Sequence, residues 1–225
     1  MKTTTATVST NESGMTLLAI MIFLTAFAFI LMMAAPAVYT DVQREKELES
    51  IRRGEEISNA IYQYVVFNAG RKLPQSMDDL LEGLPDGTKK RQILRPSAAK
   101  DPLSLDGRWR LIQPQPEVIA RFAKRIQAFN NGVLPSSPPP NQYFDKYTVS
   151  LANVLNTETE DEPDEDIDDS ADFDGVPFVG VASQSNARSV LMYYGIEKHS
   201  QWIFTPLFRG NGAMSIRPNR QPPTR

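Results

Sequence analysis

The sequence predicts an α+β fold. One long N-terminal helix, half of it inside a membrane, packs on a small antiparallel sheet that carries a large insertion. Three observations predict this fold. Residues 15–39 form a run of 25 residues without a charge, and residues 40–68 continue with apolar residues at helical spacing. Short strand patterns follow, interrupted by a stretch rich in Pro, Asp and Glu.

The apolar run is long enough to cross a bilayer. A helix of this length would measure roughly 37 Å, more than the hydrocarbon core of about 30 Å. It could be an uncleaved signal anchor, a secretory signal cleaved at Ala35-Pro36-Ala37, or a segment that is processed before its start and then retained. The run is longer than the apolar part of a secretory signal, and the fourteen residues before it hold one basic residue, Lys2.

The residues around Gly14 favour the third interpretation. Ser13-Gly14-Met15-Thr16-Leu17-Leu18 resembles the junction of type IV prepilins and type II secretion pseudopilins. Cleavage after Gly14 would make Pro36 residue 22 of the mature chain (36 − 14), where this family typically carries a helix-kinking proline. The resemblance therefore implies cleavage by prepilin peptidase, N-methylation of Met15, and a kink at Pro36.

The resemblance extends over about half of the chain. It is closest to the secretion pseudopilins related to the major subunit, and it implies a pilin-like fold. It also implies a structural subunit of a type II secretion or type IV pilus-like filament that acts in protein export. The matching segments are Arg44–Leu48, Gly54–Ile57, Ala60-Ile61, Tyr64, Pro74, Asp78–Leu81, Lys100–Pro102, Trp109, Leu111-Ile112, Phe178–Ser183 and Gln201–Phe204.

The family also implies partners and a location. The partners are prepilin peptidase, copies of this chain or other pseudopilins, an inner-membrane secretion platform and membrane lipid. The chain would cross the bacterial inner membrane once and place its C-terminal domain in the periplasm. Counting basic residues on either side of the span predicts the opposite orientation, since Lys2 precedes it and Arg44, Lys46, Arg52 and Arg53 follow it. The junction and the proline spacing outweigh that count.

Two positions depart from the family pattern. Ala19 stands where the family usually has a Glu five residues into the mature chain, and Glu12 lies where a basic residue is usual. In resembling proteins that buried carboxylate meets the N-terminal amine of a neighbouring subunit. Some subunits at the filament tip also lack it, so Ala19 favours a minor or tip subunit.

The sequence divides into seven parts. They are a leader (1–14), a membrane helix (15–39), the exposed half of the same helix (40–68), a loop with a first strand (69–113), an insertion with Pro-rich and acidic disordered parts (114–175), C-terminal strands (176–208) and a disordered tail (209–225). Within them we predict a short helix capped by Ser76 and an amphipathic helix at Glu117–Phe129. The predicted strands are Trp109–Gln113, Phe178–Ala182, Val190–Tyr194 and Gln201–Thr205.

Composition and motifs speak against an enzyme. The chain has no cysteine, and its formal net charge is −3. Residues 158–174 hold eleven Asp or Glu, which leaves the rest at −3 + 11 = +8. No basic stripe is interleaved with aromatic residues, so we expect no nucleic-acid partner.

His199, the only histidine, is expected in an exposed turn, and Trp109 and Trp202 are expected to pack where sheet and helix meet.

No cofactor is expected. The acidic tract could hold calcium, and Asp168, Asp172 and Asp174 are the residues that would bind it. However, a tract this dense is more often a solvated, self-repelling loop. The alternative function is a signal-anchored periplasmic binding module whose acidic loop captures a cation or a basic ligand. The mature N-terminus distinguishes the hypotheses: Met15 for the filament subunit, Met1 for an uncleaved anchor and Val38 for a secreted protein.

Overall fold

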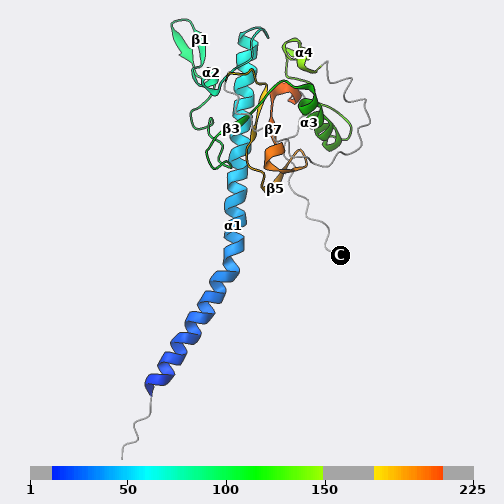
Figure 1. The fold of residues 1–225 in the computed structure, drawn as a ribbon. Coiled ribbons are helices and arrows are strands. Elements are labelled where there is room, and N and C mark those ends of the chain that lie inside the picture. Colours follow the sequence, from blue (N-terminus) through cyan, green and yellow to red (C-terminus); the bar gives the residue numbers. More distant parts are fainter. Residues whose placement is uncertain (1–11, 149–174, 210–225) are drawn as a thin grey trace, which may run out of the picture. The chain divides into compact units, whose positions relative to one another are not determined.

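The computed structural model of the chain describes residues 12–148 and 175–209. The chain divides into two compact units at Gln43 and Arg44, and the first helix, α1 (Glu12–Phe67), contributes to both (Figure 1). The prediction of one helix over Met15–Asn68 is confirmed, with an earlier start. The helix continues across Pro36, and the kink at this residue stays a prediction.

In the second unit, α1 buries one face. Ile51, Ile57, Ile61 and Val65 are all nearly inaccessible to solvent, as the three- and four-residue spacing predicts. The helix ends where the amide of Gly70 bonds to the carbonyl of Val65, and Gly70 takes the left-handed backbone that glycine tolerates best.

The remaining elements are short and mostly extended. The helices are α2 (Met77–Leu81), α3 (Pro116–Phe129) and α4 (Asp145–Thr148), with single 3-10 turns at Asn141–Tyr143, His199–Gln201 and Pro206–Phe208. The strands are β1 (Leu84–Asp86), β2 (Lys89–Arg91), β3 (Trp109–Ile112), β4 (Gly180–Ser183), β5 (Arg188–Tyr193), β6 (Ile196–Lys198) and β7 (Ile203–Phe204). Ser76 caps α2 through the amide of Asp79, as predicted.

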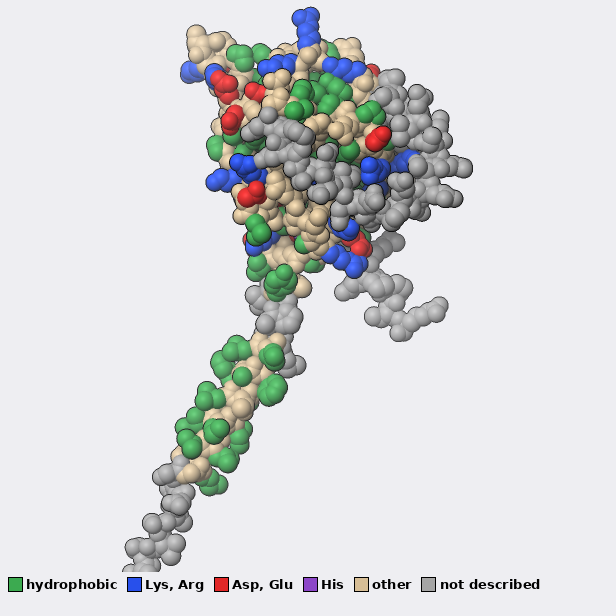
Figure 2. Space-filling model, in the orientation of Figure 1, with side chains coloured by type: hydrophobic (Ala, Val, Ile, Leu, Met, Phe, Trp, Pro, Cys, Tyr) green, Lys and Arg blue, Asp and Glu red, His purple; other side chains and the backbone are tan. Residues whose placement is uncertain are grey.

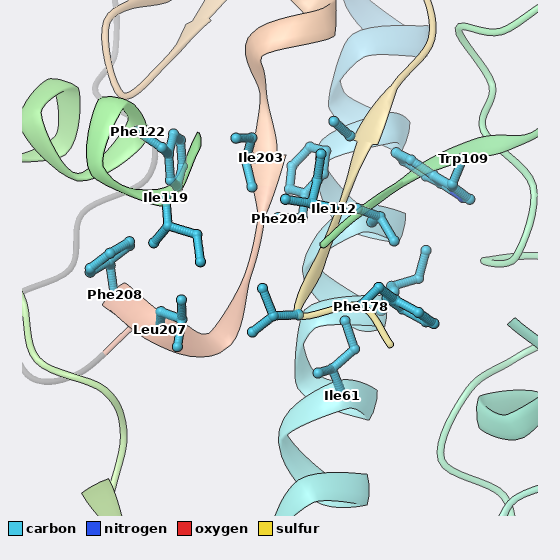
Figure 3. Packing of buried hydrophobic residues seen from close by; sticks show 14 of the residues in the cluster. Ile61, Trp109, Ile112, Ile119, Phe122, Phe178, Ile203, Phe204, Leu207 and Phe208 are labelled. Carbon is cyan, nitrogen blue, oxygen red and sulfur yellow. The ribbon is translucent and has the colours of Figure 1, made fainter. Parts of the chain in front are cut away.

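All strand pairs are antiparallel. The central sheet has the order β3-β4-β7, and β1-β2 and β5-β6 are separate hairpins. The sheet lies between α1 on one side and α3 on the other (Figure 1). The two residues of β7 point to opposite faces of the sheet, because side chains alternate along a strand. Ile203 points toward Phe122 of α3, and Phe204 points toward α1 (Figure 3).

The strand predicted at Trp109–Gln113 is present as β3, but its residues do not alternate between a buried and an exposed face. Trp109 and Ile112 are both buried, because both faces of the sheet are covered. The 137–140 segment belongs to the Pro-rich part of the insertion that was predicted to be disordered, and it is packed instead. The Ser137 hydroxyl is buried and donates to the carbonyl of Leu207, and the Tyr62 hydroxyl donates to that of Pro139. The first part of the insertion is thus a component of the core, with six buried residues on α3.

Gly54 is the point of closest approach between α1 and the sheet. A Cβ atom at this position would lie 2.3 Å from the ring of Phe204, closer than atoms pack. Phe204 in turn packs edge-to-face against Trp109 and at a tilt against Tyr193, at ring-centroid distances of 5.8 Å and 5.0 Å. The glycine therefore lets the aromatic centre of the sheet rest directly on the helix backbone.

We predict that Gly54→Ala destabilises the domain. Alanine favours a helix by about 1 kcal/mol over glycine, but overpacking a core costs about 1–3 kcal/mol. Thermal unfolding of the full chain in detergent, followed by near-ultraviolet circular dichroism, measures the net change in stability. Gly54→Ala should cost less when Phe204 is already Leu, since the shorter side chain leaves room. If Gly54→Ala lowered the stability equally with Phe or Leu at position 204, the close contact between Gly54 and Phe204 would be contradicted.

Candidate functional site: an exposed apolar segment and a buried polar cluster

The first part of α1 exposes apolar side chains on every side. The segment Gly14–Met32 is long and apolar enough to cross a membrane. Its large side chains, from Met15 to Met32, are between 55 % and 79 % exposed, and Figure 2 shows them all along the visible face of the helix. A helix with apolar side chains all round is suited to lipid or to packing among similar helices.

The residues with predicted roles in processing lie on this segment. The Gly14–Met15 bond is in the first turn of α1, whose amides have no partner within the helix, so this turn can open at little cost. Ala19 lies on the exposed part of the same helix. Thr25 donates back to the carbonyls of Met21 and Ile22, which satisfies its hydroxyl without a second helix.

In the second unit, the carboxylate of Glu47 is completely buried and fully hydrogen-bonded. It accepts from the amides of Val190 and Leu191 at 2.8–3.0 Å, and it lies 2.9 Å from Nε2 of His199. The two amides belong to the part of β5 whose register with β6 is irregular. Glu47 therefore connects α1 to the β5-β6 hairpin, because its carboxylate accepts hydrogen bonds from two amides of β5 where the pairing with β6 is irregular.

The expectation that His199 is exposed is wrong. Its side chain is 2 % exposed and lies edge-on against Trp202, with ring centroids 5.0 Å apart. Its Nδ1 is 3.3 Å from the Ser185 hydroxyl. The Ser185 hydroxyl, the His199 imidazole and the Glu47 carboxylate thus lie in the same order as the three groups of a hydrolase triad. The imidazole is enclosed, however, and Glu47 also accepts from two backbone amides, so the arrangement joins α1 to the hairpin and offers no open reaction site.

A second buried carboxylate lies close by. Asp101 accepts from the hydroxyls of Ser50 and Ser183, at 3.3 Å and 2.6 Å, and from the amide of Leu103 at 3.0 Å. Burial raises the pKa of Asp101, and these three hydrogen bonds oppose the shift. Ser50 is on α1 and Ser183 is on β4, so Asp101 links the helix to the central sheet.

Ion pairs continue along the helix surface. Arg52 and Arg53 hold the pKa of Glu49 down at about 2, and Glu56 pairs with Arg95. Glu55 pairs with Arg209 and accepts from the Tyr193 hydroxyl at 2.8 Å. Arg209 also donates to the carbonyl of Thr205, and burial lowers its pKa to about 10. These contacts fasten the end of the described chain to α1.

The predicted packing roles of Trp109 and Trp202 are confirmed. Both are buried, and their indole N–H groups donate to the carbonyls of Ala98 and Ile196. The predicted calcium ligands Asp168, Asp172 and Asp174 lie outside the described residues. Within 12–148 and 175–209, no group of three or more His, Cys, Asp or Glu side chains could hold a metal ion.

No protein-family model, curated protein or solved structure matches this chain. Function is therefore inferred from the residues themselves. Glu47 was not predicted to be a buried residue, because it lies in a run of charged residues. A signal was present: Glu47 belongs to a three- and four-residue repeat that continues through Ile51, Gly54, Ser58 and Ile61, all of them buried.

We predict that Glu47→Ala unfolds the domain readily. It leaves two amides and the His199 ring without their acceptor in a buried site, at a cost of about 3–5 kcal/mol. Glu47→Gln keeps the size and one acceptor, and should cost roughly half as much. Urea unfolding of the full chain in detergent, followed by the near-ultraviolet signal of the buried tryptophans Trp109 and Trp202, measures the loss of stability.

The matched control is Glu49→Gln, two residues along the same helix on a partly exposed side chain. This substitution should lower the free energy of unfolding by less than about 1 kcal/mol, because surface ion pairs contribute no more than that. If Glu47→Ala were as mild as Glu49→Gln, the buried cluster would not hold α1 to the hairpin.

Proposed function

We propose that this chain is a structural, pseudopilin-like subunit of a type II secretion or type IV pilus-like filament, acting in protein export. One observation carries the proposal. A single helix, α1, combines a segment that is apolar on all sides with a segment whose buried face is covered by a small antiparallel sheet. In a filament subunit the first segment packs among its copies, and the domain on the second sets the contacts at the surface.

The small residues of the apolar segment support this role. Ala19, Ala26 and Ala28 let helices approach closely, and close packing drives helix association where no hydrophobic force acts. The segment carries no ionisable side chain, so a single copy rests in the bilayer without the cost of a buried charge. The absence of a carboxylate at Ala19 also removes one means of aligning neighbouring copies, which favours a minor or tip position.

The proposal includes processing and orientation. Prepilin peptidase cuts between Gly14 and Met15, Met15 is N-methylated, and the chain spans the inner membrane once with its C-terminal domain in the periplasm. The role is structural and involves no catalysis. The competing role, a signal-anchored periplasmic binding module, keeps residues 1–14.

We predict that wild-type chain expressed with prepilin peptidase loses residues 1–14 and gains one methyl group, while Gly14→Val stays at full length. A bulky residue before the scissile bond should exclude the junction from the peptidase. Intact-mass spectrometry of the purified proteins distinguishes the two products. Asn11→Ala, in the same leader, is the control and should be processed as wild type is. If the wild-type chain also kept residues 1–14, as Gly14→Val is expected to do, this processing would be ruled out.

A further inference from the structure

A closed loop before β3 presents one leucine to solvent. Leu105 is 108 % exposed, more than any other large apolar side chain among the described residues, including those of the apolar segment of α1. The loop is closed at its base, where the amide of Asp101 donates to the carbonyl of Gly107 at 2.9 Å. Gly107 has a φ of 71°, a left-handed conformation that glycine adopts at little cost. The exposed leucine is therefore carried by a loop with a fixed base.

Hydrogen bonds inside the loop hold its shape on both sides of the leucine. The Asp106 carboxylate accepts from the Ser104 hydroxyl and, at 3.1 Å, from the amide of Arg108. The Asp101 carboxylate accepts from the amide of Leu103 at 3.0 Å. Because these carboxylates already accept hydrogen bonds within the chain, a partner can cover the loop without leaving them unsatisfied. A loop that is ordered before it binds also loses little conformational entropy on binding.

An open groove of about 670 Å³ lies between α3 and the turn of the β5-β6 hairpin. Tyr194 and Gly195 form this turn, and both have positive φ, as a two-residue turn between antiparallel strands requires. The Tyr194 ring packs edge-on against Phe122 and Phe129 of α3, with ring centroids 6.1 Å and 5.9 Å apart. Ala128 and Gly195 also line the groove and are exposed, so the groove can receive an apolar side chain beside them.

The groove offers an apolar contact and no free charge. Arg125, Arg188 and Lys198 belong to its lining, and each has interactions within the chain. Arg125 donates to the side chain of Gln201, for example, and Arg188 pairs with Glu197 at 2.7 Å. A ligand therefore gains free energy here by covering the apolar part of the lining with an apolar side chain of its own.

The loop and the groove lie on opposite sides of the central sheet. The base of the loop is fastened to α1, because Arg53 donates to the carbonyl of Lys100 at 2.9 Å and Ser50 donates to Asp101. The groove lies beside α3, and α1 and α3 cover opposite faces of the sheet (Figure 1). A contact between the loop and the groove therefore joins two copies of the chain. The joined pair still has one unused loop and one unused groove, so the same contact can repeat.

We infer that Leu105 of one copy of this chain inserts into the groove beside Ala128 and Tyr194 of a second copy. A protruding apolar side chain and an apolar pocket elsewhere on the same molecule make a head-to-tail contact, the kind that builds open chains of subunits. The inference rests on the proposed filament role for its purpose, which is to align neighbouring subunits. Ala19 removes one means of alignment from the apolar segment, and this contact supplies another in the folded domain.

Disulfide trapping tests the contact directly, because the chain has no cysteine of its own. One preparation of the full, unprocessed chain carries Leu105→Cys, and a second, made larger by a tag, carries Ala128→Cys. Both are kept in detergent micelles, which cover the apolar segment of α1. Mild oxidation of the mixture should give a disulfide-linked dimer with one copy of each size on a non-reducing gel.

The matched control uses Val133→Cys in place of Ala128→Cys. Val133 is exposed, follows α3 and is not part of the groove lining. The yield of the mixed dimer should fall at least about tenfold, because a disulfide forms only where two Cβ atoms can approach to about 4 Å. Equal yields from the two pairs, or no mixed dimer from Leu105→Cys and Ala128→Cys, would overturn the inference.

Self-association of the chain with its natural leucine gives a second readout. In sedimentation of the chain in micelles, Leu105→Ser should raise the dissociation constant at least about tenfold, the loss expected when a leucine side chain is no longer buried. Ala128→Phe fills the groove and should have the same effect. Val133→Ser, a similar change outside the groove, should stay within about twofold of wild type. Near-ultraviolet circular dichroism checks that each variant is folded.

Unchanged self-association of Leu105→Ser would overturn the inference. The proposed function would survive that result, since cleavage at Gly14 is measured separately and the trapping experiment uses the unprocessed chain.

Discussion

The sheet and the β5-β6 hairpin can rest on α1 because two residues in the buried stripe of the helix make room for them or supply hydrogen-bond acceptors. The stripe recurs at three- and four-residue intervals and consists of Glu47, Ile51, Gly54, Ser58, Ile61 and Val65. Gly54 admits the ring of Phe204, and Glu47 supplies an acceptor to amides in the irregular part of β5. Without the first, the aromatic centre would be pushed away from the helix. Without the second, the hairpin would bury unpaired amides.

The two parts of α1 therefore have different residue patterns, because they have different surroundings. Over Gly14–Met32 the apolar residues point in every direction, as a helix in lipid or among other helices needs. From Glu47 onward they follow one face, and charged residues such as Glu49, Arg52 and Glu56 form ion pairs on the others. A helix that changes pattern in this way connects a segment apolar enough to cross a membrane to a folded domain without an intervening loop, which is the arrangement that the proposed filament role uses.

Local patterns predicted the long helix, the cap at Ser76 and the helix α3, because each depends on residues close together in the chain. The buried cluster depends on topology. Glu47 and His199 are 152 residues apart, and no local pattern brings a lone histidine to that carboxylate. The burial of both Trp109 and Ile112 also depends on topology, since the helix α3 of the insertion covers the second face of the sheet. The Pro-rich part of the insertion was predicted to be disordered from composition alone, whereas Ser137 is fixed by the distant carbonyl of Leu207.

The absence of cysteine from the natural chain makes the central claim directly measurable, because single cysteines can be placed one at a time over residues 16–31. In native membranes containing the secretion apparatus, oxidation should link the chain to a neighbouring subunit that carries a cysteine in its own membrane segment. A packed helix should give cross-links that recur every three or four residues, on the face that meets its neighbour. A tip subunit would give short products, and a major subunit long ladders. A chain that stays monomeric at every position would be a solitary anchor, and the filament role would be contradicted.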